Sequence, residues 1–369
     1  MPGMDGHYFA IIRALADEGV AVSAVEKSLR NPGAATQPVW GTFPTLDFTE
    51  THPLQVLKSI GPQLSAYAKV LLFAINASQV ETVGKHVKLS RPLYEIFWPK
   101  LAKSVMELKR KDSLKDWSGQ QGLAYPRSLV FINEAQAREA SGFRYRVIMK
   151  PVRPLSSLKT LITRAVGELS QRLRGHAHDL PHLGQESIAG DDEKIFFGAL
   201  ILDRGKVVHT MADRKIADYP PPLGKTSIAE TIDNADVLRL TEQFFCGSEL
   251  SGPVSLELKL DHAGKYWVIE PTVGRTDFSV KLCISAGFNQ QVMEYQLAVG
   301  LPMTPPSTHQ GHVWYDTERD PMAYAALYGA RKPYSRGASV RPFRIFERKI
   351  GGPLAGLCSS GCRLAFAGC

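Results

Sequence analysis

The chain has 369 residues, of which 44% are hydrophobic and 22% are charged. This composition is typical of a globular protein, and the length is sufficient for two or three packed domains. Lys and Arg number 44 against 36 Asp and Glu, which gives a formal net charge of +8. Because the basic residues are scattered, the charge favours binding of small anions over a dedicated nucleic-acid interface, with a solvated basic surface as the alternative.

The five cysteines are an odd number and lack the paired spacing of zinc ligands, so they predict reduced thiols. A metal site made by Cys358, Cys362 and Cys369 is the less favoured alternative. No apolar run reaches the roughly 18 residues that a membrane-spanning helix needs, and the N-terminus lacks the pattern of a signal peptide. We therefore expect a cytoplasmic protein without a membrane or nucleic-acid partner.

Residues 1–97 predict an open α/β domain. A helical pattern covers residues 7–18, and strand-like runs cover residues 20–25 and 70–74, the second followed by Asn76. A doubly wound domain usually opens with a strand before its first glycine-containing loop, and no such strand precedes the loop here. The domain is therefore expected to be incomplete, either because the start is internal to a longer natural chain or because the first strand has been lost.

Residues 98–184 predict a second unit in which helices and strands alternate. The side chain of Asn133 is expected to cap the first turn of one helix. The expected elements are a helix at 98–121, a strand at 128–132, a short helix at 134–141 and a strand at 146–149.

Residues 185–303 predict a third unit made largely of β-hairpins, because strand-like runs are separated by short polar turns. The expected pairs are 195–202 with 207–211, and 254–260 with 266–270. Alternation places Glu257 in the interior of its strand. The tail, residues 304–369, contains several Pro and Gly residues and little periodicity, so it is expected to be loosely packed.

Lys150 ends an apolar strand, where burial of a positive charge requires an anionic partner such as a phosphate. The alternative is a lysine whose ammonium group reaches solvent at the strand end. Residues 185–193 then offer backbone groups that suit an adenine edge, followed by acidic side chains that suit ribose hydroxyls. Taken alone, that segment can equally be an acidic loop before a strand.

Glu257 and Glu270 fall on the two strands of one predicted hairpin. Two carboxylates on adjacent strands repel each other unless a divalent cation lies between them, and hard oxygen ligands suit Mg²⁺ that bridges ATP phosphates. The pair therefore predicts a Mg²⁺ site, with an exposed acidic edge as the alternative.

Lys150, the segment 186–193 and the Glu257/Glu270 pair occur in an order and at a spacing that resemble the ATP-grasp superfamily. The most similar pattern is that of the carbamoyl phosphate synthetase large chain and of carboxylate-amine ligases, including D-aspartate ligase-like proteins. The resemblance covers residues 109–300. It implies a mixed α/β (α+β) ATP-grasp fold, preceded by an incomplete Rossmann-like domain.

The resemblance also implies roles for individual residues, grouped by what each is expected to contact. Nucleotide binding is implied for Lys111, Lys150, Ser156, Ser157, Glu186, Ile188 and Glu193; binding of Mg²⁺ or Mn²⁺ for Glu257, Glu270 and Thr272; and catalysis for Arg275, Lys215 and Arg214.

Some of these positions depart from the family pattern. Thr272 stands where the family usually has an asparagine, and a threonine hydroxyl is a poorer Mg²⁺ ligand. Arg275 lies one position later than the usual arginine. Ser156 and Ser157 stand in a loop that is glycine-rich in the family, and serine gives less conformational freedom around phosphate.

The resemblance implies an ADP-forming ligase that uses ATP and Mg²⁺ to activate a carboxylate as an acyl phosphate and joins it to an amine or similar nucleophile. The expected partners are ATP and small-molecule substrates, and a homodimer is left open. Two alternatives keep the fold: a nucleotide-binding protein without turnover, and a carboxylase or carbamoyl-phosphate-forming enzyme. The chain shows no biotin-carrier or amidotransferase segment, which argues against the second alternative.

Overall fold

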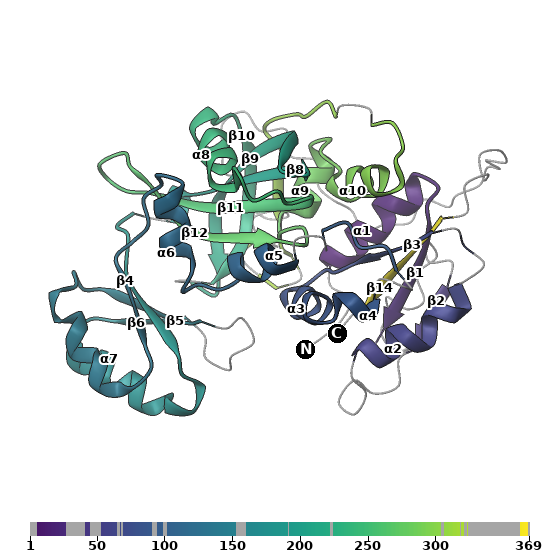
Figure 1. The fold of residues 1–369 in the computed structure, drawn as a ribbon. Coiled ribbons are helices and arrows are strands. Elements are labelled where there is room, and N and C mark those ends of the chain that lie inside the picture. The colour runs from purple at the N-terminus through teal and green to yellow at the C-terminus, as the bar shows by residue number, and fades with distance from the viewer. Residues whose placement is uncertain are drawn as a thin grey trace.

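The structure is a computed structural model, and it describes most of the chain in three sheets with their covering helices (Figure 1). The described residues are 6–26, 41–44, 53–64, 67, 69–90, 94–98, 102–152, 160–190, 192–221, 224–303, 306–317, 319–320, 323 and 362–367. The mixed α/β fold class expected from the sequence is confirmed. No helix among these residues is long and apolar enough to cross a membrane.

The N-terminal domain contains a four-stranded sheet in the order β2-β1-β14-β3, and each neighbouring pair of strands is parallel. Figure 1 shows β14, in yellow, between β1 and β3. The strands are β1 (Ala21–Glu26), β2 (Gly41–Pro44), β3 (Lys69–Phe73) and β14 (Cys362–Ala367). The helices are α1 (Gly6–Asp17), α2 (Pro53–Ile60), η2 (Gly61–Leu64), α3 (Ala77–Lys85) and α4 (Val87–Ser90).

Strand β14 fills the place where the sequence predicted a missing strand. In a doubly wound sheet with the order 3-2-1-4, the first strand lies between the second and the fourth, which is the position of β14 here. Leu364 is paired with Val22 on one side and Leu71 on the other. The expectation of a loosely packed tail is therefore wrong for this segment, because pairing with strands so distant in the chain leaves no local pattern in the sequence.

The helix expected at 98–121 is interrupted, and the structure has α5 (Ala102–Leu108) and α6 (Leu114–Gln120) instead. The Ser113 Oγ lies 2.5 Å from the Glu107 carbonyl oxygen and 2.8 Å from that of Arg110, so its hydroxyl donates to one of the two. Such side-chain bonds offer backbone carbonyls an alternative to helical partners. The interruption places Lys111 between the two helices.

The small antiparallel sheet, in the order β4-β7-β5-β6, forms a lobe that projects from the rest of the molecule (Figure 1). Its core includes Phe131, Met149 and Leu169. The segment after Asn133 is a 3₁₀ helix, and the predicted cap is confirmed because the Asn133 side chain accepts from the Gln136 N–H. The elements are β4 (Ser128–Phe131), η4 (Glu134–Gly142), β5 (Val147–Pro151), β6 (Leu161–Thr163), α7 (Val166–Gly175), η5 (Ala177–Asp179) and β7 (His182–Glu186).

The large sheet has six strands in the order β12-β11-β8-β9-β10-β13. Both predicted hairpins are confirmed, although β9 continues well beyond the expected end at residue 211. The tail contributes the edge strand β13, so this part of it is also packed. The elements are η6 (Asp192–Lys194), β8 (Ile195–Asp203), β9 (Lys206–Tyr219), β10 (Lys225–Ile232), α8 (Ala235–Phe245), β11 (Gly252–Leu260), β12 (Tyr266–Val273), α9 (Val280–Ser285), α10 (Gln290–Val299) and β13 (Val313–Tyr315).

The two faces of the large sheet have different environments, because successive side chains of a strand point to opposite faces. One face is apolar: Leu256 and Leu258 pack in the main core with Phe244 of α8 and Val105 of α5. On the other face, α9 and α10 cover Ala199, Ile201 and Met211. The rest of that second face carries the polar residues described next.

Candidate functional site

Three carboxylates lie in one row across the large sheet. Glu270 is paired with Glu257, Glu257 with Phe197, and Phe197 with Asp213. Directly paired residues in antiparallel strands have their side chains on the same face, with Cβ atoms about 5 Å apart. Glu270, Glu257 and Asp213 therefore share the face that is only partly covered by α9 and α10.

The Glu257/Glu270 pair is electrostatically unbalanced. Burial and the neighbouring charge of Glu270 raise the pKa of Glu257 to about 7. Burial alone would also raise the pKa of Glu270, but the charges of Lys111 and Lys150 outweigh burial and hold that pKa below its usual value. Glu270 is therefore stabilised as an anion by the two lysines, whereas burial and the charge of Glu270 disfavour the charged form of Glu257. A divalent cation between the two carboxylates would offset that repulsion.

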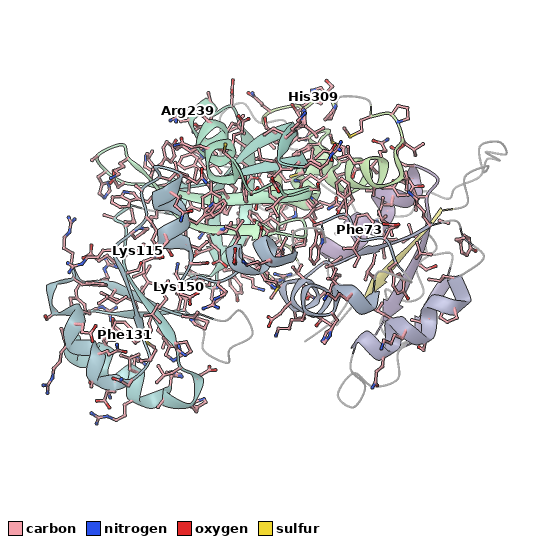
Figure 2. The ribbon with its side chains drawn as sticks, in the orientation of Figure 1. Phe73, Lys115, Phe131, Lys150, Arg239 and His309 are labelled. Atoms are coloured by element: carbon pink, nitrogen blue, oxygen red, sulfur yellow. The ribbon has the colours of Figure 1, made fainter. Side chains whose placement is uncertain are left out.

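Two lysines from different parts of the chain face this pair. The Lys111 Nζ lies 2.5 Å from Glu270 Oε2. Lys150 is on the small lobe, and Figure 2 labels it on the side of the lobe nearer to the rest of the molecule. Burial and the nearby Lys111 lower the pKa of Lys150 to about 8. Two like charges held this close favour a bound anion.

Gln185 and Tyr125 also contribute to the site, although their individual roles were not predicted. The Lys150 Nζ donates to Gln185 Oε1 at 3.1 Å, and the Gln185 amide donates to the Ser128 hydroxyl at 3.3 Å. The Tyr125 hydroxyl donates to the Lys111 carbonyl oxygen at 3.4 Å, and burial raises the pKa of Tyr125 to about 12. Adjacent side chains of a strand point to opposite faces, so Glu186 and Gln185 lie on different faces of β7. This alternation is the sequence signal that could have indicated Gln185.

The residues expected to bind adenine and ribose lie between the small lobe and the large sheet. Glu186 ends β7, and its Oε1 accepts from the Arg144 N–H at 2.8 Å, so the carboxylate is already engaged within the lobe. Ile188 is half-buried and Glu193 is exposed on the connection to β8. Strand β7 continues past the domain boundary expected after residue 184. Ser156 and Ser157 lie outside the described residues.

The structure separates the two expected catalytic residues of β9. Lys215 lies two positions after Asp213 and therefore on the same face; its Nζ lies 3.2 Å from Asp218 Oδ2, and its charge acts to lower the pKa of Glu257. Arg214 points to the opposite face, where its Nε donates to Glu230 Oε1 at 3.1 Å. The structure thus brings Lys215 to the candidate site and leaves Arg214 outside it.

Arg275 follows β12 and adds to the positive charge around Glu270. Its Nη1 donates to the Thr276 carbonyl oxygen at 2.7 Å. The neighbouring Lys109 donates from Nζ to the Ala77 carbonyl oxygen at 2.5 Å, and burial lowers the pKa of Lys109 to about 8. These basic groups place a second positive region beside the carboxylate pair, on the side of the N-terminal domain.

The described residues fit a Mg²⁺ nucleotide better than an all-protein metal centre. Within them, no group of three or more His, Cys, Asp or Glu residues is arranged to hold a metal ion. Mg²⁺ usually takes one or two carboxylates and completes its coordination with phosphate oxygens and water. Glu257 and Glu270 supply the carboxylates, Thr272 shares their face in the next row of the ladder, and the two lysines suit phosphate.

Neither models of protein families nor the sequences of characterised proteins match this chain. Solved structures do match its fold. The L-amino acid ligase from Bacillus licheniformis superposes with a TM-score of 0.60 and 18% identity over 78% of this chain and 70% of its own. The biotin carboxylase domain of 2-oxoglutarate carboxylase from Hydrogenobacter thermophilus, in complex with MgADP, ADP and bicarbonate, gives 0.65 and 12% over 82% and 70%.

A third match is N5-carboxyaminoimidazole synthase from Aspergillus clavatus, in complex with ADP and 5-aminoimidazole ribonucleotide. Its TM-score is 0.60 at 12% identity, over 84% of this chain and 78% of that protein. These likenesses confirm the ATP-grasp fold expected from the order of the sequence motifs.

Proposed function

We propose that the protein is an ADP-forming ligase that uses ATP and Mg²⁺ to activate a carboxylate as an acyl phosphate and joins it to an amine. The observation that carries this proposal is that two lysines face the Glu257/Glu270 pair. Lys150 lies on the small lobe, and Lys111 lies between α5 and α6. The two carboxylates suit a divalent cation, and the two lysines suit the phosphates of a nucleoside triphosphate. The enzymes with a similar fold that are named above bind ADP or catalyse ligation or carboxylation, which supports the assignment.

Nucleotide binding is assigned to the space between the small lobe and the large sheet. Lys150 would contact phosphate from β5, held in place by Gln185. Lys111 would exchange Glu270 for a phosphate oxygen, which frees that carboxylate. The connection from Glu186 to Glu193 would contact adenine and ribose. Charge-assisted contacts of this kind contribute about 1.5–3 kcal/mol each.

Glu257 and Glu270 would hold Mg²⁺, with a weaker contribution from the Thr272 hydroxyl. When bound, the metal would neutralise phosphate charge as the terminal phosphoryl group is transferred. A substrate carboxylate oxygen then forms a bond to the terminal phosphorus while the bond to ADP breaks. The neutral amine nitrogen would next attack the acyl carbon with its lone pair, phosphate would leave with the bonding electron pair, and the nitrogen would lose one proton to solvent.

Arg275 and Lys215 are the protein groups best placed to stabilise the oxygens that gain charge in these two steps. Both act on the carboxylate pair electrostatically, Arg275 on Glu270 and Lys215 on Glu257. Positive groups fixed at the place where charge develops lower the barrier more than groups that must reorganise. Arg214 lies on the opposite face of the sheet and is assigned no role in these two steps.

Trapping with hydroxylamine tests this proposal. The protein is incubated with ATP, Mg²⁺, hydroxylamine and a panel of amino acids and small carboxylic acids, and hydroxamate, ADP and phosphate are measured. We expect all three to form with at least one carboxylate. AMP and pyrophosphate would instead indicate adenylation, and nucleotide binding without any product would support the alternative of a binding protein without turnover.

A further inference from the structure

Three aromatic side chains form a cluster on the face of the large sheet that carries the proposed site. The Phe278 ring lies 4.8 Å from the ring of Phe197 on β8 and 5.7 Å from the ring of Trp314 on β13, measured between centroids. Phe197 is buried, whereas Phe278 and Trp314 are half-buried. None of the three belongs to the four hydrophobic clusters that form the cores of the described part of the chain. The aromatic cluster is therefore separate from those cores.

The strand register places both ends of the aromatic cluster beside proposed catalytic groups. Phe197 is paired with Glu257, so their side chains share a face, with Cβ atoms about 5 Å apart. Trp314 is paired with Ala229 of β10, and Ala229 is paired with Lys215 of β9. Trp314 therefore lies in the row of Lys215 and on the same face of the sheet.

Phe278 connects these two ends. The strand order β8-β9-β10-β13 puts two strands between Phe197 and Trp314, and the Phe278 ring contacts both, so it lies over β9 and β10. The Phe278 N–H donates to Asp277 Oδ1 at 2.8 Å, and Asp277 Oδ2 accepts from the Ser255 hydroxyl at 2.5 Å. Because Ser255 is on β11, these bonds hold the backbone at Phe278 against the sheet.

We propose that Phe278 and Trp314 form an aromatic wall that contacts an aromatic ring, or a similarly large apolar group, on one of the two substrates joined at this site. The inference rests on the proposed ligase function and specifies its substrate class. Half-exposed rings present apolar surface, and covering that surface with a ring favours binding. Small-molecule sites combine such walls with a few fixed polar groups, which Glu257 and Lys215 supply here.

Adenine is the competing occupant of the aromatic wall, because its flat ring also packs well against aromatic side chains. A substrate group and adenine differ in what they predict for variants of the wall. Contact with a substrate group leaves the affinity for MgADP unchanged when a ring is removed, whereas contact with adenine lowers it.

Calorimetry in the presence of MgADP tests the wall with two matched pairs of probes. 3-Phenylpropionate is compared with propionate as a carboxylate, and phenethylamine with ethylamine as an amine. The ring-bearing member of at least one pair should bind the natural protein at least about tenfold more tightly, since its phenyl group buries apolar surface. Phe278→Leu and Trp314→Leu remove a ring but stay apolar, and each should reduce this preference at least about threefold. Val207→Ala, at the exposed start of β9, is the control and should retain it.

The affinity of each variant for MgADP alone completes the test and should equal that of the natural protein. No preference for the ring in either pair, a preference that both leucine variants retain, or a parallel loss of MgADP affinity would overturn the proposal. Because Phe278→Leu could disturb packing on Phe197, Trp314→Leu on the edge strand β13 is the decisive variant, and Trp314→Phe, which keeps a ring, should retain most of the preference.

The hydroxylamine assay separates this proposal from the ligase assignment. Formation of hydroxamate by a protein without any preference for the ring would overturn the aromatic wall alone. Absence of hydroxamate from a protein that keeps the preference would count against the ligase assignment alone.

Discussion

Glu257 and Glu270 lie directly opposite each other on β11 and β12, and the Lys111 Nζ lies 2.5 Å from Glu270 Oε2. Repulsion between the two carboxylates destabilises the folded protein, whereas their negative charges attract a cation. The raised pKa of Glu257, about 7, reflects its burial and this repulsion.

Glu257→Gln removes one charge while keeping the size of the side chain. We expect the Tm without nucleotide to be equal or higher, since the repulsion is lost, and the affinity for MgADP to fall at least about tenfold. Calorimetry with MgADP and denaturation without it give the two quantities. A lower Tm with unchanged affinity would mean that the pair is structural.

Thr272→Asn should preserve or increase the affinity for Mg²⁺ if Thr272 faces the metal.

Lys150→Met removes the buried charge of β5 and keeps the aliphatic part of the side chain. Nucleotide affinity should fall at least about tenfold, because one charge-assisted phosphate contact is lost. The Tm without nucleotide should hardly decrease, since burial already disfavours the charged form of Lys150. Lys206→Met, at the exposed start of β9, is the matched control and should bind nucleotide normally. Normal binding by the Lys150 variant would remove this residue from the site.

Arg214→Met and Lys215→Met distinguish the two faces of β9. Lys215→Met should reduce turnover strongly, because Lys215 acts on Glu257. Arg214→Met should leave KM and kcat nearly unchanged but destabilise the protein by about 1–3 kcal/mol, because Glu230, a buried carboxylate, loses its partner. Urea unfolding and ADP release measure the two effects. Loss of turnover in the Arg214 variant at full stability would contradict the assignment of faces.

The sequence predicted the parts of the site that lie on locally patterned strands. Two strand-like runs around a short polar turn predict one hairpin that carries Glu257 and Glu270, and the register confirms that they are paired. Arg214 and Lys215 were grouped because they are adjacent, although adjacency in a strand means opposite faces. Counting alternate positions from Lys215 places Arg214 on the opposite face of the strand.

Contacts between distant segments were not predictable in this way. Asp213 lies in the row of the carboxylate pair only because β8 stands between β11 and β9, and no local pattern encodes that strand order. The insertion of β14 between β1 and β3 is the extreme case, since the segments that pair are at opposite ends of the chain. Both features depend on long-range pairing, which single-sequence patterns do not report.

Ending the chain after residue 361 removes β14 and leaves β1 and β3 without their shared neighbour. We expect the N-terminal domain to become sensitive to proteolysis within residues 1–97, because unpaired strand edges expose their backbone groups. MgADP binding should persist, since the proposed site lies on the other two sheets. A chain that ends after Ala367 is the control. Equal protease resistance of the two chains would show that β14 is not needed in the sheet.

Glu294 on α10 provides a test of pH dependence. Its side chain is buried beside Gly252, and burial raises its pKa to about 8. The folded protein therefore keeps this proton up to about pH 8, whereas the unfolded chain loses it above about pH 4.5, the ordinary value for Glu. Between these values the folded state binds more protons, so the free energy of unfolding must fall as pH rises, by at most about 1.4 kcal/mol per pH unit for this group.

Glu294→Gln stays neutral at every pH and should remove this contribution. The difference in unfolding free energy between the variant and the natural protein should therefore grow in favour of the variant from pH 5 to pH 8 and level off above that range. Urea unfolding at steps of one pH unit measures it, and Glu242→Gln, an exposed carboxylate on α8, is the control whose difference should stay nearly constant. If the Glu294 variant and the natural protein give parallel curves, Glu294 is ionised in the folded protein and has a cationic partner or access to solvent.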